Sequence, residues 1–354
     1  MPHTVGIVRR YQHLWQLEGI EEVITLGEGR TPLIPVHPPW HPQKGPQVWG
    51  KLEGCNPTGS FKDRGMTVAV TMAKAQGKRV ALCASTGNTA ASAAAYAARA
   101  GMTAVVVIPG GKVAPGKLLQ VQAYGALLLE VEGAFDVALA ALRRAMADQP
   151  EWELVNSVNP WRILGQESAA YEIAEDLGRA PDLLVIPVGN AGNITAYHRG
   201  FQRLGLKPPR FIGGQAAGAA SMVEGRDIEH PETVASAIRI GKPVSRPYAE
   251  EAVRTTGGAF VAVSDEAILA AQAELARQGI FVEPASATPY AVLTKLWDQG
   301  ALLRDPDSII VLIFTGNGLK DADTALRNFP ARRAQWDGQP LSLAALVQRE
   351  VEHV

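Results

Sequence analysis

The chain has 354 residues, enough for about two domains, and its apolar fraction of 47% excludes general disorder. Its 34 basic and 35 acidic residues give a net charge of −1, without the basic surplus that nucleic-acid-binding proteins show. No apolar run approaches the ~18 residues of a membrane span, and the start of the chain has no apolar signal core, so we expect neither a membrane partner nor secretion. Two cysteines, Cys55 and Cys83, lack the spacing of a metal site, so we expect no metal and a reducing, cytoplasmic location.

Short apolar runs alternate with longer alanine-rich amphipathic runs along most of the chain. Helical spacing predicts a helix at 134–148, and Ser264 with Gly279 marks the start and end of another. The apolar runs have little polar alternation, which is typical of strands buried on both faces of a parallel sheet. The strands predicted in this way are 79–84, 104–108, 126–131, 153–156, 183–188, 211–215 and 309–314. The alternation of strand and helix predicts an α/β fold with open parallel sheets.

Three loops that follow predicted strands place Gly beside Asn, at 85–89, 189–193 and 315–318. Because ligands of open α/β sheets bind beyond the carboxyl ends of the strands, we expect these loops to border one crevice. The loop at 189–193 suits a phosphate best, since a glycine-rich turn that enters a helix exposes several N–H groups. Neither a P-loop nor a GxGxxG fingerprint occurs, which disfavours a nucleotide site.

The stretch 56–65, with the sequence NPTGSFKDRG, combines a turn with the start of a helix. Thr58 or Ser60 can cap this helix, which places Lys62 in its first turn. A positive charge there opposes the helix dipole, which lowers the pKa of the ammonium group and favours a neutral, nucleophilic amine. Such an amine can form a Schiff base with a carbonyl compound.

Taken together, the loops and the lysine resemble the fold-type II pyridoxal-phosphate (PLP) enzymes, and among them the threonine synthase family. SFKDRG and TGN would also fit the dehydratases and O-acetylserine sulfhydrylases of this fold, whereas GNAGN and Thr315 favour the threonine synthases. The motifs that carry the resemblance are GEGRTPL at 27–33, SFKDRG at 60–65, STGN at 85–88, GNAGN at 189–193, EPAS at 283–286 and TGNGLK at 315–320.

The resemblance implies two open parallel-sheet α/β domains of the tryptophan synthase β type, with PLP in the cleft between them. Residues 1–46 would be an N-terminal segment of the large domain, 47–158 the small domain, and 159–354 the rest of the large domain, which binds the PLP phosphate. Lys62 would be the catalytic residue that holds the PLP aldehyde and moves protons, Asn88 would bond the ring hydroxyl, and Thr315 would face the pyridine nitrogen. The implied cofactor contacts are Lys62, Phe61, Asn88, Gly189, Asn190, Ala191, Gly192, Asn193 and Thr315.

The substrate that the resemblance implies is O-phospho-L-homoserine, which loses phosphate from Cγ and gains water at Cβ to give L-threonine. Its carboxylate would sit on a loop whose hydroxyl groups come from Ser85, Thr86 and Thr89. The substrate phosphate needs a second anion site, for which the candidates are Asn156, Ser157, Arg162 and, more weakly, Lys51. The structural alternative for Arg162 is a surface ion pair with Glu167 or another acidic residue. The expected assembly is a homodimer.

Two alternatives within the same fold stay open. A serine/threonine dehydratase or an O-acetylserine-type β-replacement enzyme would need no second phosphate site. A non-catalytic PLP-binding protein would have no need of Lys62. A nicotinamide-dependent dehydrogenase is disfavoured because the chain lacks the dinucleotide fingerprint.

Overall fold

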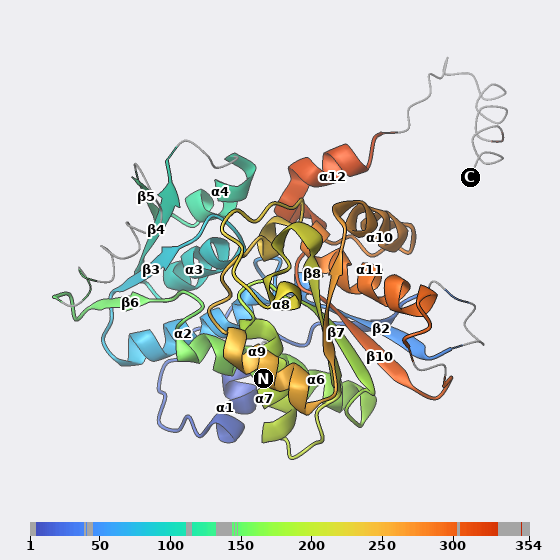
Figure 1. The fold of residues 1–354 in the computed structure, drawn as a ribbon. Helices are drawn as coiled ribbons and strands as arrows, with labels where there is room; N and C mark the ends of the chain where they lie inside the picture. Colours follow the sequence, from blue (N-terminus) through green and yellow to red (C-terminus); the bar gives the residue numbers. More distant parts are fainter. Residues whose placement is uncertain are drawn as a thin grey trace.

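The computed structural model describes residues 5–38, 40, 45–110, 115–131, 144, 146, 148–302, 305–331 and 348. The helix predicted at 134–148 therefore lies almost wholly outside the described residues. Within the described part, the chain forms two open sheets with helices packed around them (Figure 1). None of the described helices has both the length and the apolar character that a membrane span requires.

The larger sheet has six strands, in which only β1 runs antiparallel to its neighbour. In sheet order they are β1 (Leu33–Pro35), β2 (Gln47–Leu52), β10 (Ile309–Phe314), β7 (Leu183–Pro187), β8 (Arg210–Ala216) and β9 (Ala259–Val263). The smaller sheet is parallel throughout and consists of β5 (Leu127–Val131), β4 (Thr103–Pro109), β3 (Val80–Ala84) and β6 (Trp152–Leu154). Two open sheets, one wholly and one mostly parallel, confirm the predicted α/β fold class.

All seven predicted strands are present, and three further strands were not predicted. The missed strands are β1, which has three residues, β2, which includes Gly50 and Lys51, and β9, whose residues are mostly half-buried. Each lacks the long apolar run that marks a central strand. The domain boundaries stay a prediction; β2, at the start of the range 47–158, pairs with the larger sheet.

The helices cover both sheets, with α11 against the strands of the larger sheet and α3 against β3 and β4 of the smaller one (Figure 1). The predicted helix after Ser264 is confirmed, and the Ser264 hydroxyl accepts the Ala267 N–H at 3.2 Å. The α-helices are α1 (Ile7–Trp15), α2 (Lys62–Ala75), α3 (Asn88–Arg99), α4 (Pro115–Ala123), α6 (Pro160–Leu177), α7 (Gly192–Arg203), α8 (Ser221–Glu224), α9 (Arg246–Thr255), α10 (Asp265–Arg277), α11 (Pro284–Asp298) and α12 (Ala322–Asn328). Short 3₁₀ turns include η2 (Glu53–Cys55) and η5 (Gly318–Asp321).

Helices α2 and α6 cross in close contact because a glycine on each removes the side chain at the crossing. A Cβ on Gly165 would lie 2.0 Å from the carbonyl oxygen of Arg64. A Cβ on Gly65 would lie 2.6 Å from the carbonyl oxygen of Arg162. The crossing therefore brings the first turn of α2, which starts at Lys62, against the first turn of α6, which holds Arg162.

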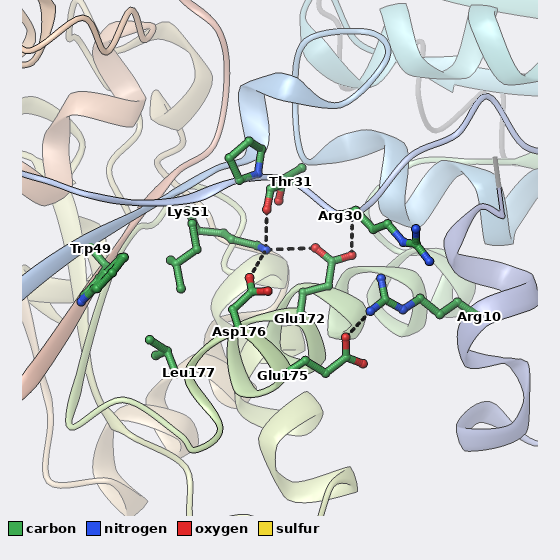
Figure 2. Close-up of a pocket in the computed structure, with 11 residues that line it drawn as sticks. Arg10, Arg30, Thr31, Trp49, Lys51, Glu172, Glu175, Asp176 and Leu177 are labelled. Carbon is green, nitrogen blue, oxygen red and sulfur yellow. Dashed lines mark hydrogen bonds and ion pairs between the residues drawn. The ribbon is translucent and has the colours of Figure 1, made fainter. Parts of the chain in front are cut away.

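Behind this crossing, Lys51 of β2 and Glu172 of α6 form a buried ion pair, with 3.0 Å between Nζ and Oε2. Lys51 Nζ also donates to the carbonyl oxygen of Thr31 at 2.7 Å and lies 3.4 Å from Asp176 Oδ2 (Figure 2). The side chain of Lys51 is fully buried. Its charge therefore needs these partners.

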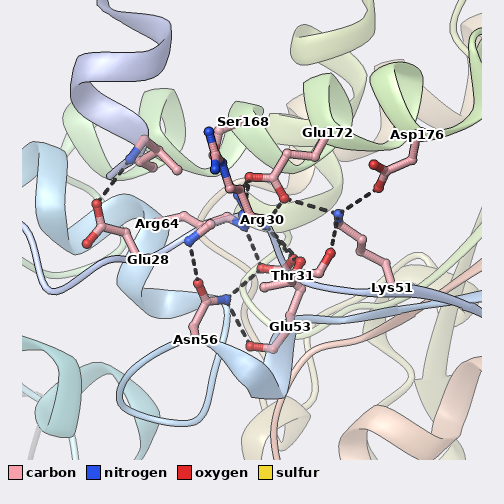
Figure 3. A network of polar contacts seen from close by, with 12 residues as sticks. Glu28, Arg30, Thr31, Lys51, Glu53, Asn56, Arg64, Ser168, Glu172 and Asp176 are labelled. Atoms are coloured by element: carbon pink, nitrogen blue, oxygen red, sulfur yellow. Dashed lines mark hydrogen bonds and ion pairs between the residues drawn. The ribbon is translucent and has the colours of Figure 1, made fainter. Parts of the chain in front are cut away.

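The Arg64 guanidinium extends the same cluster and binds two buried carboxylates with paired hydrogen bonds (Figure 3). Its distances to the oxygens of Glu53 are 2.6 and 2.8 Å, and those to Glu172 are also 2.6 and 2.8 Å. Thr31 and Ser168 accept further bonds from the same guanidinium. Burial acts to raise the pKa of Glu172, but the positive charges of Arg64 and Lys51 hold that pKa at about 2.

Replacing Arg64 by an apolar residue should strongly destabilise the protein. Arg64→Met leaves the carboxylates of Glu53 and Glu172 buried with too little positive charge, which we expect to lower the free energy of unfolding by about 3–5 kcal/mol. Urea unfolding at neutral pH measures this. The control is Arg79→Met, whose side chain is 76% exposed and should change stability by less than about 0.5 kcal/mol. Equal, small effects for both variants would contradict the role given to Arg64.

Candidate active site

The loop that carries Lys62 is fastened to the loop that follows β10. The Phe61 N–H donates to the carbonyl oxygen of Thr315 at 3.0 Å, and the Asn317 N–H donates to that of Gly59 at 2.9 Å. Lys62 is the first residue of α2, in agreement with the sequence prediction. Two loops far apart in sequence are thus held together by their backbones.

The predicted capping of α2 by Thr58 or Ser60 is wrong, because Phe61 is the N-cap residue and makes no side-chain capping bond. Ser60 Oγ accepts the Lys62 N–H at 3.4 Å. The Thr58 hydroxyl instead donates to the Asp63 carboxylate at 2.6 Å, so Thr58 does not cap the helix. Ser92 also donates to this carboxylate at 2.6 Å, and the Asp63 side chain thereby links the turn before α2 to α3.

The amine of Lys62 lies in a setting that favours its neutral form. Its Nζ is 4.3 Å from the centre of the Phe61 ring and has neither a hydrogen bond nor an ion pair within the described part of the chain. Burial, assisted by the positive charge of Arg162, lowers the pKa of Lys62 to about 7. The pKa of Lys62 is thus lowered as predicted, but the cause differs. Desolvation and the neighbouring Arg162 lower it, whereas the sequence analysis attributed the effect to the helix dipole.

Asn88, the first residue of α3, binds the buried carboxylate of Glu283, which directly precedes α11. Its Nδ2 donates to both oxygens of Glu283, at 3.0 and 3.2 Å. The Glu283 N–H in turn donates to the carbonyl oxygen of Gly316, and a Cβ on Gly316 would lie 2.4 Å from the carboxylate. Burial raises the pKa of Glu283 to about 7.

Glu283 belongs to the motif EPAS at 283–286, but the sequence analysis predicted no role for it. The available signal was its place directly before Pro284, where α11 begins beside the three loops. Ser286, from the same motif, was also given no role; its Oγ lies 2.7 Å from Thr315 Oγ1 and accepts the Gly316 N–H at 2.7 Å. Both residues therefore brace side chains that were predicted to contact a cofactor.

The loop at 189–193 leaves the same sheet edge as the Thr315 loop, because β7 and β10 are parallel neighbours. It enters α7 at Gly192 through Ala191, whose φ of +64° is the left-handed conformation. The first N–H groups of a helix have no partner within the helix, and the buried Asn193 Nδ2 has none in the described residues. At Gly189, a Cβ would lie 3.1 Å from the Cα of Ile238. This turn, with unpaired donors at a helix start, fits a phosphate group.

The stretch 156–162 connects β6 to α6. Asn159 caps the helix by accepting the Trp161 N–H at 3.0 Å. The Asn156 side chain bonds both the N–H and the carbonyl of Ala84 at 2.9 Å, which fastens this stretch to the end of β3. Ser157 follows in the same turn and is half-buried. The stretch therefore lies beside the loop that begins with Ser85.

Arg162 is a buried arginine with an incomplete set of partners. Its side chain is 1% exposed, and Nη1 donates to the carbonyl oxygen of Val155 at 2.7 Å. Its Nε and Nη2 have no hydrogen-bond partner in the described residues. Burial lowers the pKa of Arg162 to about 10, which leaves it charged at neutral pH.

The suggested ion pair between Arg162 and Glu167 is absent from the structure. Glu167 instead accepts hydrogen bonds from Arg203 at 2.6 Å and from the Tyr171 hydroxyl at 2.8 Å. The guanidinium of Arg162 is therefore still available to an anion.

The remaining predicted residues lie in two places. Ser85, Thr86 and Thr89 are half-buried around the start of α3, and their predicted contact with a substrate carboxylate stays a prediction. Lys51, by contrast, is bound to Thr31, Glu172 and Asp176 away from these loops, so its geometry does not favour it as a phosphate ligand. Among the described residues, no cluster of His, Cys, Asp and Glu has the arrangement of a metal site.

Comparison with known proteins identifies the chemistry that this arrangement serves. The model of the family described as "Pyridoxal-phosphate dependent enzyme" matches residues 24–316. A threonine synthase of Mycobacterium bovis is 53% identical over 332 residues, which are 92% of this chain and 91% of that protein. One from Bacillus sp. (strain ULM1) is 51% identical, and one from Methanocaldococcus jannaschii is 46% identical, each over 91% of this chain and 92% and 82% of those proteins.

Solved structures agree on the fold. Cysteine synthase from Entamoeba histolytica has a TM-score of 0.73 at 23% identity, over 90% of this chain and 92% of that one. Maize serine racemase has a TM-score of 0.71 at 19% identity and covers 99% of both chains. The chain therefore belongs to the family of pyridoxal-phosphate-dependent enzymes and, within it, to the threonine synthases, whose members are PLP-dependent lyases.

Proposed function

We propose that the chain converts O-phospho-L-homoserine and water into L-threonine and inorganic phosphate. The observation that carries the proposal is the buried, partly unpaired guanidinium of Arg162, whose charge acts on Lys62. It offers a second anion site, separate from the turn at 189–193 that fits the phosphate of the cofactor. A dehydratase or a β-replacement enzyme of the same fold would require only the cofactor's phosphate site.

Each polar group of PLP has a residue or turn in the described structure that could bind it. Lys62 Nζ would hold its aldehyde, the turn at 189–193 its phosphate, Asn88 its ring hydroxyl, and Thr315 its pyridine nitrogen. Phe61 would contact the ring from beside Lys62. PLP, when bound, supplies an electron sink for negative charge that develops on the substrate carbons. Because Thr315 offers a hydroxyl and no carboxylate, it would not hold a full positive charge on the ring.

The chain's own groups would then orient the substrate. The hydroxyls of Ser85, Thr86 and Thr89 would bind its carboxylate, and Arg162, with Ser157, its phosphate. As a neutral amine, Lys62 Nζ can accept a proton from a substrate carbon and return it to another. Glu283 would keep the amide of Asn88 in place through their two hydrogen bonds.

The division into an N-terminal segment at 1–46, a small domain at 47–158 and a large domain at 159–354 is part of the proposal, as are a homodimeric assembly and a cytoplasmic location. The smaller sheet, whose strands all lie within 47–158, and the resemblance to the PLP enzymes support the division, whereas the pairing of β2 with the larger sheet speaks against its first boundary. Size-exclusion chromatography with light scattering measures the assembly.

The function is tested by release of phosphate from O-phospho-L-homoserine, with the amino-acid product identified by mass spectrometry. We expect one L-threonine for each phosphate released. Lys62→Ala should abolish both and should remove the pyridoxyl group that borohydride leaves on the peptide containing Lys62. Formation of 2-oxobutanoate from threonine in place of these products would favour the dehydratase alternative.

The binding of PLP to the apoprotein should depend on pH through Lys62. Since only the neutral amine attacks the aldehyde, the rate of covalent attachment should rise as pH increases through about 7 and level off above it. Stopped-flow absorbance measures this rate. Glu283→Gln removes an anion that raises the pKa of Lys62, so it should shift the midpoint to lower pH. A midpoint near the ordinary lysine value would contradict the assigned environment.

Loss of Arg162 should reduce use of the phosphorylated substrate. Each charge-assisted bond contributes about 1.5–3 kcal/mol, so Arg162→Gln should lower kcat/KM for O-phospho-L-homoserine by roughly tenfold to a few hundredfold. Retention of PLP and slow deamination of serine, which has no phosphate, should fall much less, because Arg162 acts on them only through the pKa of Lys62. Arg199→Gln, in which the lost guanidinium lies over Tyr248, is the matched control. An equal loss with both substrates would mean that Arg162 has a structural role.

A further inference from the structure

A cavity of about 580 Å³ opens on the side of the molecule where α1, β1, β2 and the end of α6 meet. None of Lys62, Asn88, Thr315 or the turn at 189–193 lines it. Its volume falls within the range of small-molecule sites. The charged groups of its lining are balanced, since Arg10, Arg30 and Lys51 face Glu172, Glu175 and Asp176.

Arg30 supplies the basic side of this cavity, and its backbone is held in an unfavourable conformation. Its φ of +49° is rare for a residue with a side chain. The Arg30 N–H donates to Glu172 Oε1 at 2.7 Å, which fixes this conformation. Its guanidinium is exposed and has no hydrogen bond or ion pair in the described part of the chain, whereas neighbouring Arg10 is paired with Glu175. Arg30 is therefore the basic group with capacity for a ligand anion.

The other two sides of the cavity differ in chemistry. Asp176 is 46% exposed, and its partner Lys51 lies at 3.4 Å, a long contact that leaves the carboxylate able to accept more bonds. Trp49 and Leu177 supply apolar surface. In Figure 2, the two guanidinium groups lie on one side of the view, Asp176 lies between, and Trp49 and Leu177 lie on the opposite side.

We propose that this cavity binds a free L-α-amino acid with an apolar side chain, and that the bound amino acid regulates the enzyme. The carboxylate of the ligand would pair with Arg30, its ammonium group with Asp176, and its side chain would cover Trp49 and Leu177. A zwitterion suits the site because it adds no net charge to a lining that is already balanced. A simple anion would pair with Arg30 but would leave Asp176 with only its long contact to Lys51.

The route to the catalytic lysine is short and consists of buried contacts. Glu172 binds the backbone of Arg30 at the cavity and the guanidinium of Arg64 in the first turn of α2 (Figure 3). Arg64 follows Lys62 by two residues. A ligand that alters the position of Arg30 or Asp176 therefore acts on the charges that hold the start of α2. The regulatory part of the proposal rests on the proposed function, whereas the binding part does not.

Isothermal titration calorimetry of the holoenzyme with L-leucine tests the binding. We expect saturable binding at millimolar concentration, weakened about tenfold or more by Arg30→Gln and by Asp176→Asn. The matched controls are Arg277→Gln and Asp298→Asn, which remove the same charges outside the cavity and should bind as wild type does. Thermal unfolding of each variant establishes that it is folded.

Two probes that each lack one charge define the ligand class. 4-Methylpentanoate has no ammonium group and 3-methylbutylamine has no carboxylate, so each should bind more weakly than L-leucine. Binding of inorganic phosphate that depends on Arg30, without binding of L-leucine, would overturn the proposal in favour of an anion site. If L-leucine still binds both cavity variants and changes the PLP absorbance, the amino acid binds at the active site. That result would also overturn the proposal.

The regulatory part is tested by the kinetics of phosphate release. Saturating L-leucine should change kcat/KM for O-phospho-L-homoserine by at least about twofold in the wild type, and Arg30→Gln should need about tenfold more L-leucine, or more still, for the same change. Binding without any kinetic change would overturn this part. If the wild type releases no phosphate at all, the proposed function fails, and the calorimetry alone decides whether the cavity binds an amino acid.

Discussion

The position of Lys62 depends on the buried ion pairs of Arg64, two residues further along α2. This guanidinium binds Glu53 of η2 and Glu172 of α6, and Lys51 of β2 supplies a second positive charge to Glu172. A charge in this interior is stable only while its partners remain. The helix that begins with Lys62 is consequently tied at its first turn to the larger sheet and to α6. The glycines at the α2–α6 crossing make that approach possible.

The surroundings of Lys62 differ from this cluster because some of their buried polar atoms lack hydrogen-bond partners in the described residues. Around Arg64 the guanidinium meets several acceptors, whereas Arg162 has two nitrogens, and Asn193 one, without a partner in the described residues. Buried polar atoms in proteins are rarely left unpaired. Other such atoms, for example Trp40 Nε1 and Tyr197 Oη, belong to uncharged side chains in apolar cores, and Arg210 lacks a partner only at Nε, whereas the charged guanidinium of Arg162 lacks partners at two nitrogens. A bound anion would supply partners for the two unpaired nitrogens of Arg162 and would balance its charge.

Helix α6 runs from the surroundings of Lys62 to the outer cavity. Arg162 lies in its first turn and Asp176 near its end, with Glu172 between them. At 1.5 Å per residue, its 18 residues span about 27 Å. A rigid element of this length, held at its middle by Arg64, gives the two sites a common mechanical support. The coupling between them is then a property of the packing, and it does not require an extended pathway of side chains.

The sequence alone determined the central strands and the loops at their carboxyl ends, because continuous apolar runs and Gly–Asn turns are local signals. It also singled out Lys62 as the candidate for the Schiff base, which stays a prediction. It also determined the family, since the motifs that carry the resemblance extend along most of the chain. Only the tertiary structure decided which charged residues are buried together. Lys51 and Arg162 look alike in sequence as surface cations, yet one is paired with Glu172 and the other is left open beside Lys62. The reason is physical: the partner and the dielectric surroundings of a charge come from segments far away in the chain, and no local pattern records them.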